Sequence, residues 1–274
     1  MVFQRMSPTR RLRAASRQGR TEIVRALLDK GADVHADNDW ALHWAILNGH
    51  TEIVKVLVDK GADVHAREDE ALRWASRGGH TETVKALLDK GADVHAQEDY
   101  ALRWASYYGH TETVKLLLKA GADVHAKDDL ALGWASANGH TDTVKLLLKA
   151  GADVHAWNDW ALRIASMNGH AEIVKLLLDA GADVHAKNDE ALRWASANGH
   201  TDTVKLLREW IEREKDAPPP DKVVARGPEA GEAEYASWAL AVPATPQVPE
   251  VKLLDLPMPM PPRQSPKLRL PDPL

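Results

Sequence analysis

The sequence predicts an all-α solenoid of about seven stacked helix pairs, followed by a proline-rich tail. The hexapeptide GADVHA begins at residue 31 and returns at 61, 91, 121, 151 and 181, so the repeat is thirty residues long. Each repeat holds two short apolar runs at helical spacing, and helices this short are marginal alone. Of 15 prolines, 14 lie at or after Pro218. The part of the chain before Pro218, which has only one proline, is therefore predicted to form a stack of helix pairs.

The proline distribution divides the chain into three regions. We expect an N-terminal extension over residues 1–8, a repeat array over 9–215 and a tail over 216–274. Segments such as AVPATPQVPE in the tail cannot bury enough apolar area to fold, so the tail is predicted to be disordered or extended. Within it, PMPMPPR at 257–263 is a weak candidate ligand for an aromatic groove.

Composition excludes several classes of function. The net charge of -5 argues against a general nucleic-acid binder, and the absence of cysteine excludes disulfides and thiolate metal sites. No apolar run approaches the 18 or so residues of a membrane helix, and the arginine-rich start lacks the apolar core of a signal peptide. We expect a monomeric cytoplasmic protein, with the nucleus or a host cytoplasm as alternative locations.

The first helix of each pair is predicted from the run Ala41, Leu42 and Ala45, which Asn48 interrupts. Aspartate stands just before each run and is expected to cap the helix. These aspartates are Asp39, Asp69, Asp99, Asp129, Asp159 and Asp189. Four of them stand four residues before an arginine, the favourable order for an ion pair on a helix. Those arginines are Arg73, Arg103, Arg163 and Arg193.

The second helix is predicted from Ile53, Val54 and Leu57, which recur at helical spacing. Thr51 precedes the run as the expected cap. Gly61 follows it, where a left-handed residue can close a helix. The last pair continues to about residue 215 and turns polar, as the end of a repeat array requires.

The repeats resemble ankyrin repeats. GADVHA is similar to the family's G-A-D-V-N-A, and NGHTDTVKLLLKAGAD at 138–153 is similar to its second helix and stop. The family's T-P-L-H-x-A opening is missing, and five residues separate Ala36 from Leu42 where the family has about eight. The array therefore resembles a short ankyrin-repeat variant that is associated with large DNA viruses of protists. The resemblance implies protein binding through a concave face, and the shortening implies loss of the projecting β-turn finger.

The histidines raise a metal-binding hypothesis. Twelve of the 13 recur every fifteen residues, from His35 to His200. Equivalent positions on adjacent repeats lie about 8–10 Å apart, too far for two imidazoles to share a zinc ion. We therefore favour structural hydrogen bonding and keep metal binding as an alternative. No catalytic or nucleotide-binding motif is present, so we expect neither an enzyme nor a cofactor.

Five tryptophans share one register in the first helix: Trp44, Trp74, Trp104, Trp134 and Trp194. Burial of such large side chains between helices would stabilise the array considerably, so we expect them in the core. A ladder of rings that stacks a cofactor is the alternative interpretation.

Variation among the repeats predicts the binding surface. The copies agree at the positions that packing fixes and differ at the turn before the first helix and at its end. Several of these variable positions are aromatic or methionine, a composition typical of interfaces. The predicted partner-binding residues are Trp40, Tyr100, Tyr107, Tyr108, Trp157, Trp160 and Met167. We expect an interaction scaffold that binds a protein through its concave face, with a passive array without a partner as the alternative.

Overall fold

A computed structural model describes residues 7–216 and contains fourteen helices in that range. The first helices of the pairs are α1 (Pro8–Arg17), α3 (Ala36–Leu47), α5 (Ala66–Arg77), α7 (Ala96–Tyr107), α9 (Ala126–Ala137), α11 (Ala156–Met167) and α13 (Ala186–Ala197). The second helices are α2 (Thr21–Asp29), α4 (Thr51–Asp59), α6 (Thr81–Asp89), α8 (Thr111–Lys119), α10 (Thr141–Lys149), α12 (Ala171–Asp179) and α14 (Thr201–Asp216). The predicted tail lies outside the described residues.

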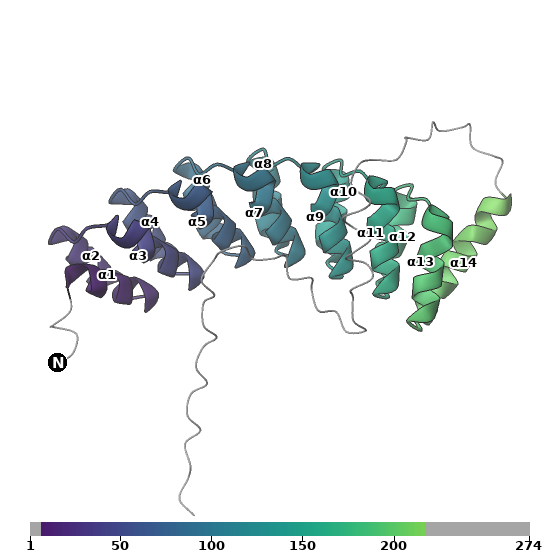
Figure 1. Ribbon diagram of the computed structural model, residues 1–274, viewed down its shortest axis with the longest axis horizontal. Coiled ribbons are helices and arrows are strands. Elements are labelled where there is room, and N and C mark those ends of the chain that lie inside the picture. Colours follow the sequence, from purple (N-terminus) through teal and green to yellow (C-terminus); the bar gives the residue numbers. More distant parts are fainter. Residues whose placement is uncertain (1–6, 217–274) are drawn as a thin grey trace, which may run out of the picture. The chain divides into compact units, whose positions relative to one another are not determined.

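The helices form seven antiparallel pairs that stack side by side (Figure 1). Each helix contacts the other member of its pair and the equivalent helices of the adjacent pairs. One continuous core of leucine, valine, isoleucine and alanine runs through the stack. The predicted all-α solenoid is confirmed. No helix in residues 7–216 has the length and apolar character needed to cross a membrane.

The second helices form for the predicted reason. Ile53, Val54 and Leu57 are at most 1% exposed, and Gly61 closes α4 with φ 96°. The Ala62 amide then donates to the Leu57 carbonyl over 2.9 Å, as in a Schellman motif. The predicted side-chain cap at Thr51 is wrong. Its hydroxyl instead shares a 2.8 Å hydrogen bond with the hydroxyl of Thr83 in the next pair.

The connection before each first helix is a single left-handed turn. In the first copy, Asp37, Asn38 and Asp39 have φ values of 57°, 58° and 57°, and the other five copies repeat this conformation. Three residues in this conformation reverse the chain within a short space. No strand occurs in the described range 7–216, so the turn takes the place of a projecting β-finger.

The aspartate that ends this turn is a clamp between repeats, so its predicted role as a helix cap is wrong. Asp99 is 4% exposed, and its Oδ1 accepts a 2.8 Å hydrogen bond from the Asp123 amide in the next loop. The His95 Nδ1 donates to the same carboxylate over 3.1 Å. Both partners satisfy a buried carboxylate that would otherwise be costly. We call this arrangement the aspartate clamp.

The arginine four residues after the clamp does not pair with it, contrary to the predicted ion pair. Arg103 donates from Nη2 to the Gln97 carbonyl over 2.8 Å and from Nε to the Glu98 carbonyl over 3.1 Å. Arg163 makes the equivalent bonds to the turn of its own repeat. The guanidinium therefore holds the carbonyls of the left-handed turn.

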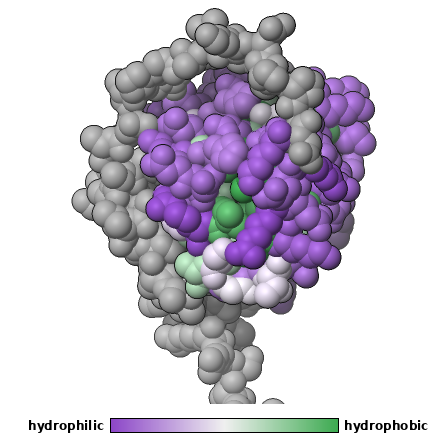
Figure 2. Space-filling view, turned by 90° about the vertical axis from the view of Figure 1, so that its right-hand side faces the viewer, coloured by the Kyte–Doolittle hydropathy of each residue, from purple (hydrophilic) through white to green (hydrophobic). Residues whose placement is uncertain are grey.

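The C-terminal end of the array leaves apolar positions half-covered. Leu192 and Val204 are half-buried, whereas Leu162 and Val174 at the same positions of the preceding pair are fully buried. Figure 2 looks onto this end, where hydrophobic side chains show between hydrophilic ones. Arg208 is exposed, as expected for the polar surface of a terminal helix.

The aspartate clamp predicts a difference between two aspartates of the same register. Asp99→Ala should lower the free energy of unfolding by about 1–3 kcal/mol, because it leaves the Asp123 amide without the acceptor that joins the two repeats. Asp189→Ala is the control, since the Asp189 side chain is 46% exposed and no further GADVHA loop follows it. Urea unfolding of both variants measures the difference. Equal losses would contradict the clamp.

Candidate interaction surface

The tryptophans of the shared register are half-buried on the first helices, so their predicted full burial in the core is wrong, although Trp74 does pack against it. Trp44, Trp74, Trp104 and Trp134 are all half-buried, and only Trp74 among them packs against the apolar core. Between Trp74 and Trp104, the side chain three residues after Trp74 fills the space between the rings. The Arg77 guanidinium lies 4.9 Å from the Trp74 ring and 4.5 Å from the Trp104 ring.

The rings are most concentrated on α5, α7 and α9. The Tyr100 ring lies tilted, 5.3 Å from that of Trp104, which lies 5.6 Å from Tyr108, and Tyr107 meets the Trp134 ring edge-on at 5.5 Å. We define the central aromatic cluster as Trp74, Arg77, Tyr100, Trp104, Tyr107, Tyr108 and Trp134. The helical spacing of residues 100, 104 and 108 aligns three of these rings along one ridge of α7. That spacing was the signal by which the sequence could have assigned Trp104 to the surface.

Tyr107 and Tyr108 form the outer part of the cluster. Tyr108 is 38% exposed, and its hydroxyl accepts a 3.2 Å hydrogen bond from Arg77 Nε. Tyr107 packs edge-on against Tyr108 at 4.8 Å. Burial, and secondarily Tyr108, raise the pKa of the Tyr107 phenol, so it remains protonated at neutral pH. The pair offers two neutral aromatic rings beside one guanidinium.

The other predicted binding residues occupy two separate places. Trp40 lies on α3, between the guanidinium groups of Arg13 at 5.9 Å and Arg67 at 5.1 Å. Trp157 and Met167 belong to α11 and are half-buried. The Trp157 indole donates to the Asp128 carbonyl of the preceding repeat over 3.0 Å. The structure brings together Tyr100, Tyr107 and Tyr108 within the central aromatic cluster.

Trp160 is buried, so the expectation that it faces solvent or a partner is wrong. It is 6% exposed and packs against Gly133 on the preceding first helix. A Cβ at Gly133 would lie 1.8 Å from Trp160 Cζ3, so only glycine admits this ring. Arginine stands at the equivalent positions Arg103 and Arg163. The missing side chain makes room for the tryptophan of the next repeat.

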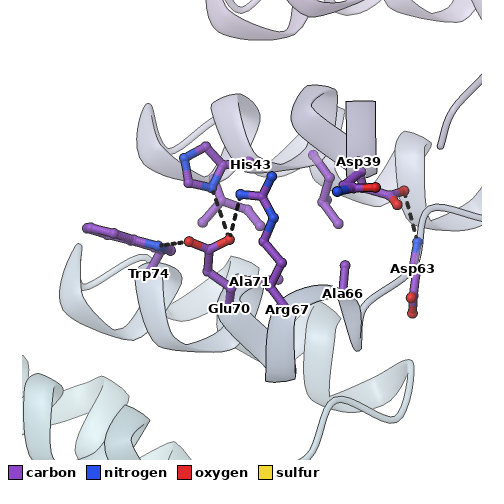
Figure 3. A pocket seen from close by; sticks show the side chains of 11 residues that line it. Asp39, His43, Asp63, Ala66, Arg67, Glu70, Ala71 and Trp74 are labelled. Atoms are coloured by element: carbon purple, nitrogen blue, oxygen red, sulfur yellow. Dashed lines mark hydrogen bonds and ion pairs between the residues drawn. The ribbon is translucent and has the colours of Figure 1, made fainter. Parts of the chain in front are cut away.

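The contact equivalent to that between Gly133 and Trp160 is polar between α3 and α5. Glu70 on α5 is 6% exposed and lies 3.7 Å from His43 Nδ1 on α3 (Figure 3). It also pairs with Arg67 at 3.2 Å and accepts from the Trp74 indole over 2.9 Å. The cavity beside these side chains measures about 20 Å³, which suits one water molecule and no larger ligand. Burial lowers the pKa of His43, although Glu70 opposes this shift.

The residues of the left-handed turns are matched between neighbours in the same way. Gln97 donates to the Glu68 carboxylate of the preceding turn, and Lys127 pairs with Glu98 one repeat later. Arg163 and Glu190 form an ion pair between α11 and α13. The expectation that the variable positions are free of packing is therefore wrong at the buried Glu70 and Trp160, whereas Gln97 and Lys127 in the turns are exposed. At these positions the residue type matches the residue that the neighbouring repeat carries.

Comparison with known proteins identifies the family. The family model "Ankyrin repeats (3 copies)" matches residues 10–68, 64–128 and 132–217. The chain belongs to the ankyrin-repeat family. Such repeats are generally protein-interaction modules. The crystal structure of the human ASB11 ankyrin repeat domain superimposes with a TM-score of 0.67 at 27% identity, covering 79% of this chain and all of that one. No curated protein matches significantly.

The ankyrin histidines form two rows of hydrogen bonds. His110, His140 and His200 each place Nε2 2.9 Å from the carbonyl of the residue 33 positions earlier, on the preceding first helix. Their rings lie against glycines of that repeat, such as Gly109 beside His140. The other row contacts the aspartate clamps, as at His95. No group of three histidine or acidic side chains in residues 7–216 is arranged to hold a metal ion.

The contact between Gly133 and Trp160 predicts a rescue by double substitution. Gly133→Arg alone should lower the free energy of unfolding by about 1–3 kcal/mol, because the new side chain overlaps the indole. Adding Trp160→Glu should recover most of this loss, since the double variant recreates the Arg163–Glu190 pair one repeat earlier. Chemical denaturation of the single and double variants measures the coupling. Additive losses would argue against matched neighbours.

The pKa values of two histidines predict how stability depends on pH. Burial lowers the pKa of His80 and His170, and neighbouring histidines lower it further. The unfolded chain therefore binds protons first as the pH falls below about 6.5, so folding is progressively disfavoured there. The variant His80→Gln/His170→Gln should show a smaller fall in melting temperature between pH 7.5 and 5.5. Equal pH dependence of the variant and the native chain would refute this.

Proposed function

We propose that the array binds a partner protein through the face formed by the first helices, centred on the central aromatic cluster. Tyr108 supports this most directly, because it is the only large hydrophobic side chain in residues 7–216 that is exposed. Aromatic side chains beside an arginine are the groups that most often dominate binding energy at interfaces. The first helices also contact each other more extensively than the second helices do. This supports a concave first-helix face.

A passive array is the second candidate, and the matched contacts favour it in part. Trp160, Glu70 and Glu190 are explained by their neighbours, so their variation needs no partner. Tyr107 and Tyr108 differ from these residues. Tyr108 remains 38% exposed even though it contacts Trp104, Tyr107 and Arg77, so part of its ring is still accessible to a partner. We therefore place the partner on α7 and its neighbours, and leave the buried Trp160 outside the proposed surface.

The proposal is tested with the variant Tyr107→Ser/Tyr108→Ser in the full chain. Loss of two rings at the centre of an interface should weaken binding of a captured partner at least tenfold, because each such residue contributes about 2 kcal/mol or more. Affinity capture from cells, followed by titration of the captured protein, measures this. Circular dichroism establishes that the helices are retained.

The matched control lies in the same pair but on the second helix. Glu112→Ser/Lys115→Ser removes two side chains of α8 that are 76% and 66% exposed and form a 3.7 Å ion pair. Exposed pairs contribute little to stability, so this variant should fold and bind as the native chain does. A tyrosine variant that binds as well as this control would refute the proposed surface.

A further inference from the structure

The first-helix face carries a basic surface, although the chain as a whole has a net charge of -5. Several arginines and no aspartate or glutamate occur in the corresponding stretches 11–18, 41–48, 71–78 and 101–108. Arg17 and Arg77 hold the same position two repeats apart, and Leu47 holds it in the repeat between them. We call Arg17, Trp44, Leu47, Trp74 and Arg77 the basic row. A positive surface on an acidic protein favours an acidic partner.

The two arginines of the basic row have no carboxylate partner among residues 7–216. The Arg17 guanidinium lies 4.6 Å from the Trp44 ring, whereas Arg77 contacts tryptophan rings and the Tyr108 hydroxyl. Arg77 uses Nε for the bond to Tyr108, which leaves its two Nη atoms without an acceptor in this range. Adjacent guanidinium N–H groups bind a carboxylate through two parallel hydrogen bonds. Arg77 is therefore oriented by its neighbours and still able to bind an acid.

The distance between the two arginines limits the spacing of the acids that they can bind. Helices α1, α3 and α5 pack in succession. Packed helices lie about 8–10 Å apart, so equivalent positions two repeats apart are separated by roughly 16–20 Å. An extended chain advances about 3.3 Å per residue. Two acidic residues about five or six positions apart on an extended segment therefore reach both guanidinium groups.

The middle of the basic row is apolar. Leu47 is half-buried and lies between the two arginines of its register, with Trp44 on its own helix and Trp74 on the next. We propose, building on the proposed function, that the partner presents an extended segment with two acidic residues about five or six positions apart. Arg17 and Arg77 bind the acids, and an apolar residue between them packs on Leu47. Because Trp74 and Arg77 also belong to the central aromatic cluster, this segment continues the proposed interface toward α1.

A protein segment fits the basic row better than a single-stranded nucleic acid does. Proteins that bind single strands stack successive bases on the faces of aromatic rings. Here the Arg17 guanidinium already lies over the Trp44 ring, and that of Arg77 lies over the rings of Trp74 and Trp104. These guanidinium groups occupy the ring faces that bases would need. A nucleic acid is therefore the alternative ligand in the test.

Peptide binding to the full chain tests the inference. The probe is a fluorescein-labelled peptide with two glutamates six positions apart, a leucine midway between them and threonine elsewhere, with anisotropy as the readout. Arg17→Gln and Arg77→Gln should each weaken binding about tenfold, because each removes one charge-assisted pair. Arg25→Gln on the second helix α2 removes the same charge from an exposed pair with Glu52 and should bind as the native chain does. No binding to the native chain, or equal affinity of all four chains, would overturn the inference.

Two altered peptides define the ligand. A peptide with glutamine in place of both glutamates, and one with the glutamates only three positions apart, should each bind roughly fivefold more weakly or worse. Equal binding of the glutamine peptide would overturn the requirement for acids. Equal binding of the peptide with the shorter spacing would overturn the match to two arginines.

Reversal of charge keeps the test decisive even if Arg77→Gln disturbs the aromatic cluster. Arg17 is exposed, so Arg17→Glu should retain the helices, which circular dichroism measures. This variant should bind the peptide with two glutamates about tenfold more weakly, because like charges then meet. Replacement of the facing glutamate by lysine should restore binding to the variant, and the position that restores it gives the direction of the bound segment. Failure of both lysine peptides to restore binding would overturn the inference.

Three further results separate the possible explanations. Fluorescein-labelled oligothymidylate that binds more tightly than the acidic peptide, and that Arg17→Gln weakens, would assign the basic row to nucleic acid and overturn the inference. If the acidic peptide does not bind while Tyr107→Ser/Tyr108→Ser still releases a captured partner, this inference falls and the proposed function stands. If the peptide binds through Arg17 and Arg77 while the tyrosine variant keeps its partner, the inference stands and the proposed centre on α7 falls.

Discussion

The array depends on one hydrogen bond, which the buried carboxylates of the first five aspartates of this register accept from the following loop. A left-handed conformation costs a non-glycine residue about 1–2 kcal/mol, and each connection contains three such residues. The conformation persists because Asp99 fixes the end of the turn to the Asp123 amide and Arg103 binds its carbonyls. This combination lets a thirty-residue unit reverse direction without a β-hairpin. It also joins every repeat to the next, so the strained turn and the stacking of the array stabilise each other.

A second consequence is that the order of the repeats is built into their contacts. Glu70 fits His43, Trp160 fits Gly133 and Glu190 fits Arg163, each across a boundary between first helices. Exchange of two repeats would place a tryptophan against an arginine or leave a buried carboxylate without its partner. Such matched contacts favour one register of stacking in a chain whose repeats are otherwise similar enough to pair wrongly. Residue differences between the repeats of this array can thus reflect contacts with the adjacent repeat as well as contacts with a binding partner.

The central aromatic cluster is the part of the array that matched neighbours explain least. Its rings are half-exposed, hold an arginine between them and leave a buried indole donor without an acceptor in residues 7–216. Ring contacts within the cluster fix the side chains before any ligand arrives, which lowers the entropic cost of binding. The repeats therefore place one tryptophan on each successive first helix of the cluster, and α7 with its C-terminal end adds the tyrosines.

The sequence by itself determined the period, the helix pairs, the glycine stops and the family, because these follow from spacing along the chain. Leu42, Val54 and Gly61 could be assigned from their own repeat alone. Only the tertiary structure decided the roles of residues that meet across repeats. The clamp aspartates looked like helix caps because each stands just before an apolar run, but their carboxylates accept from an amide 24 residues away. The burial of Trp160 depends on Gly133, which lies 27 residues earlier on another helix. Periodicity shows which positions recur, but contact between helices determines which of them are covered.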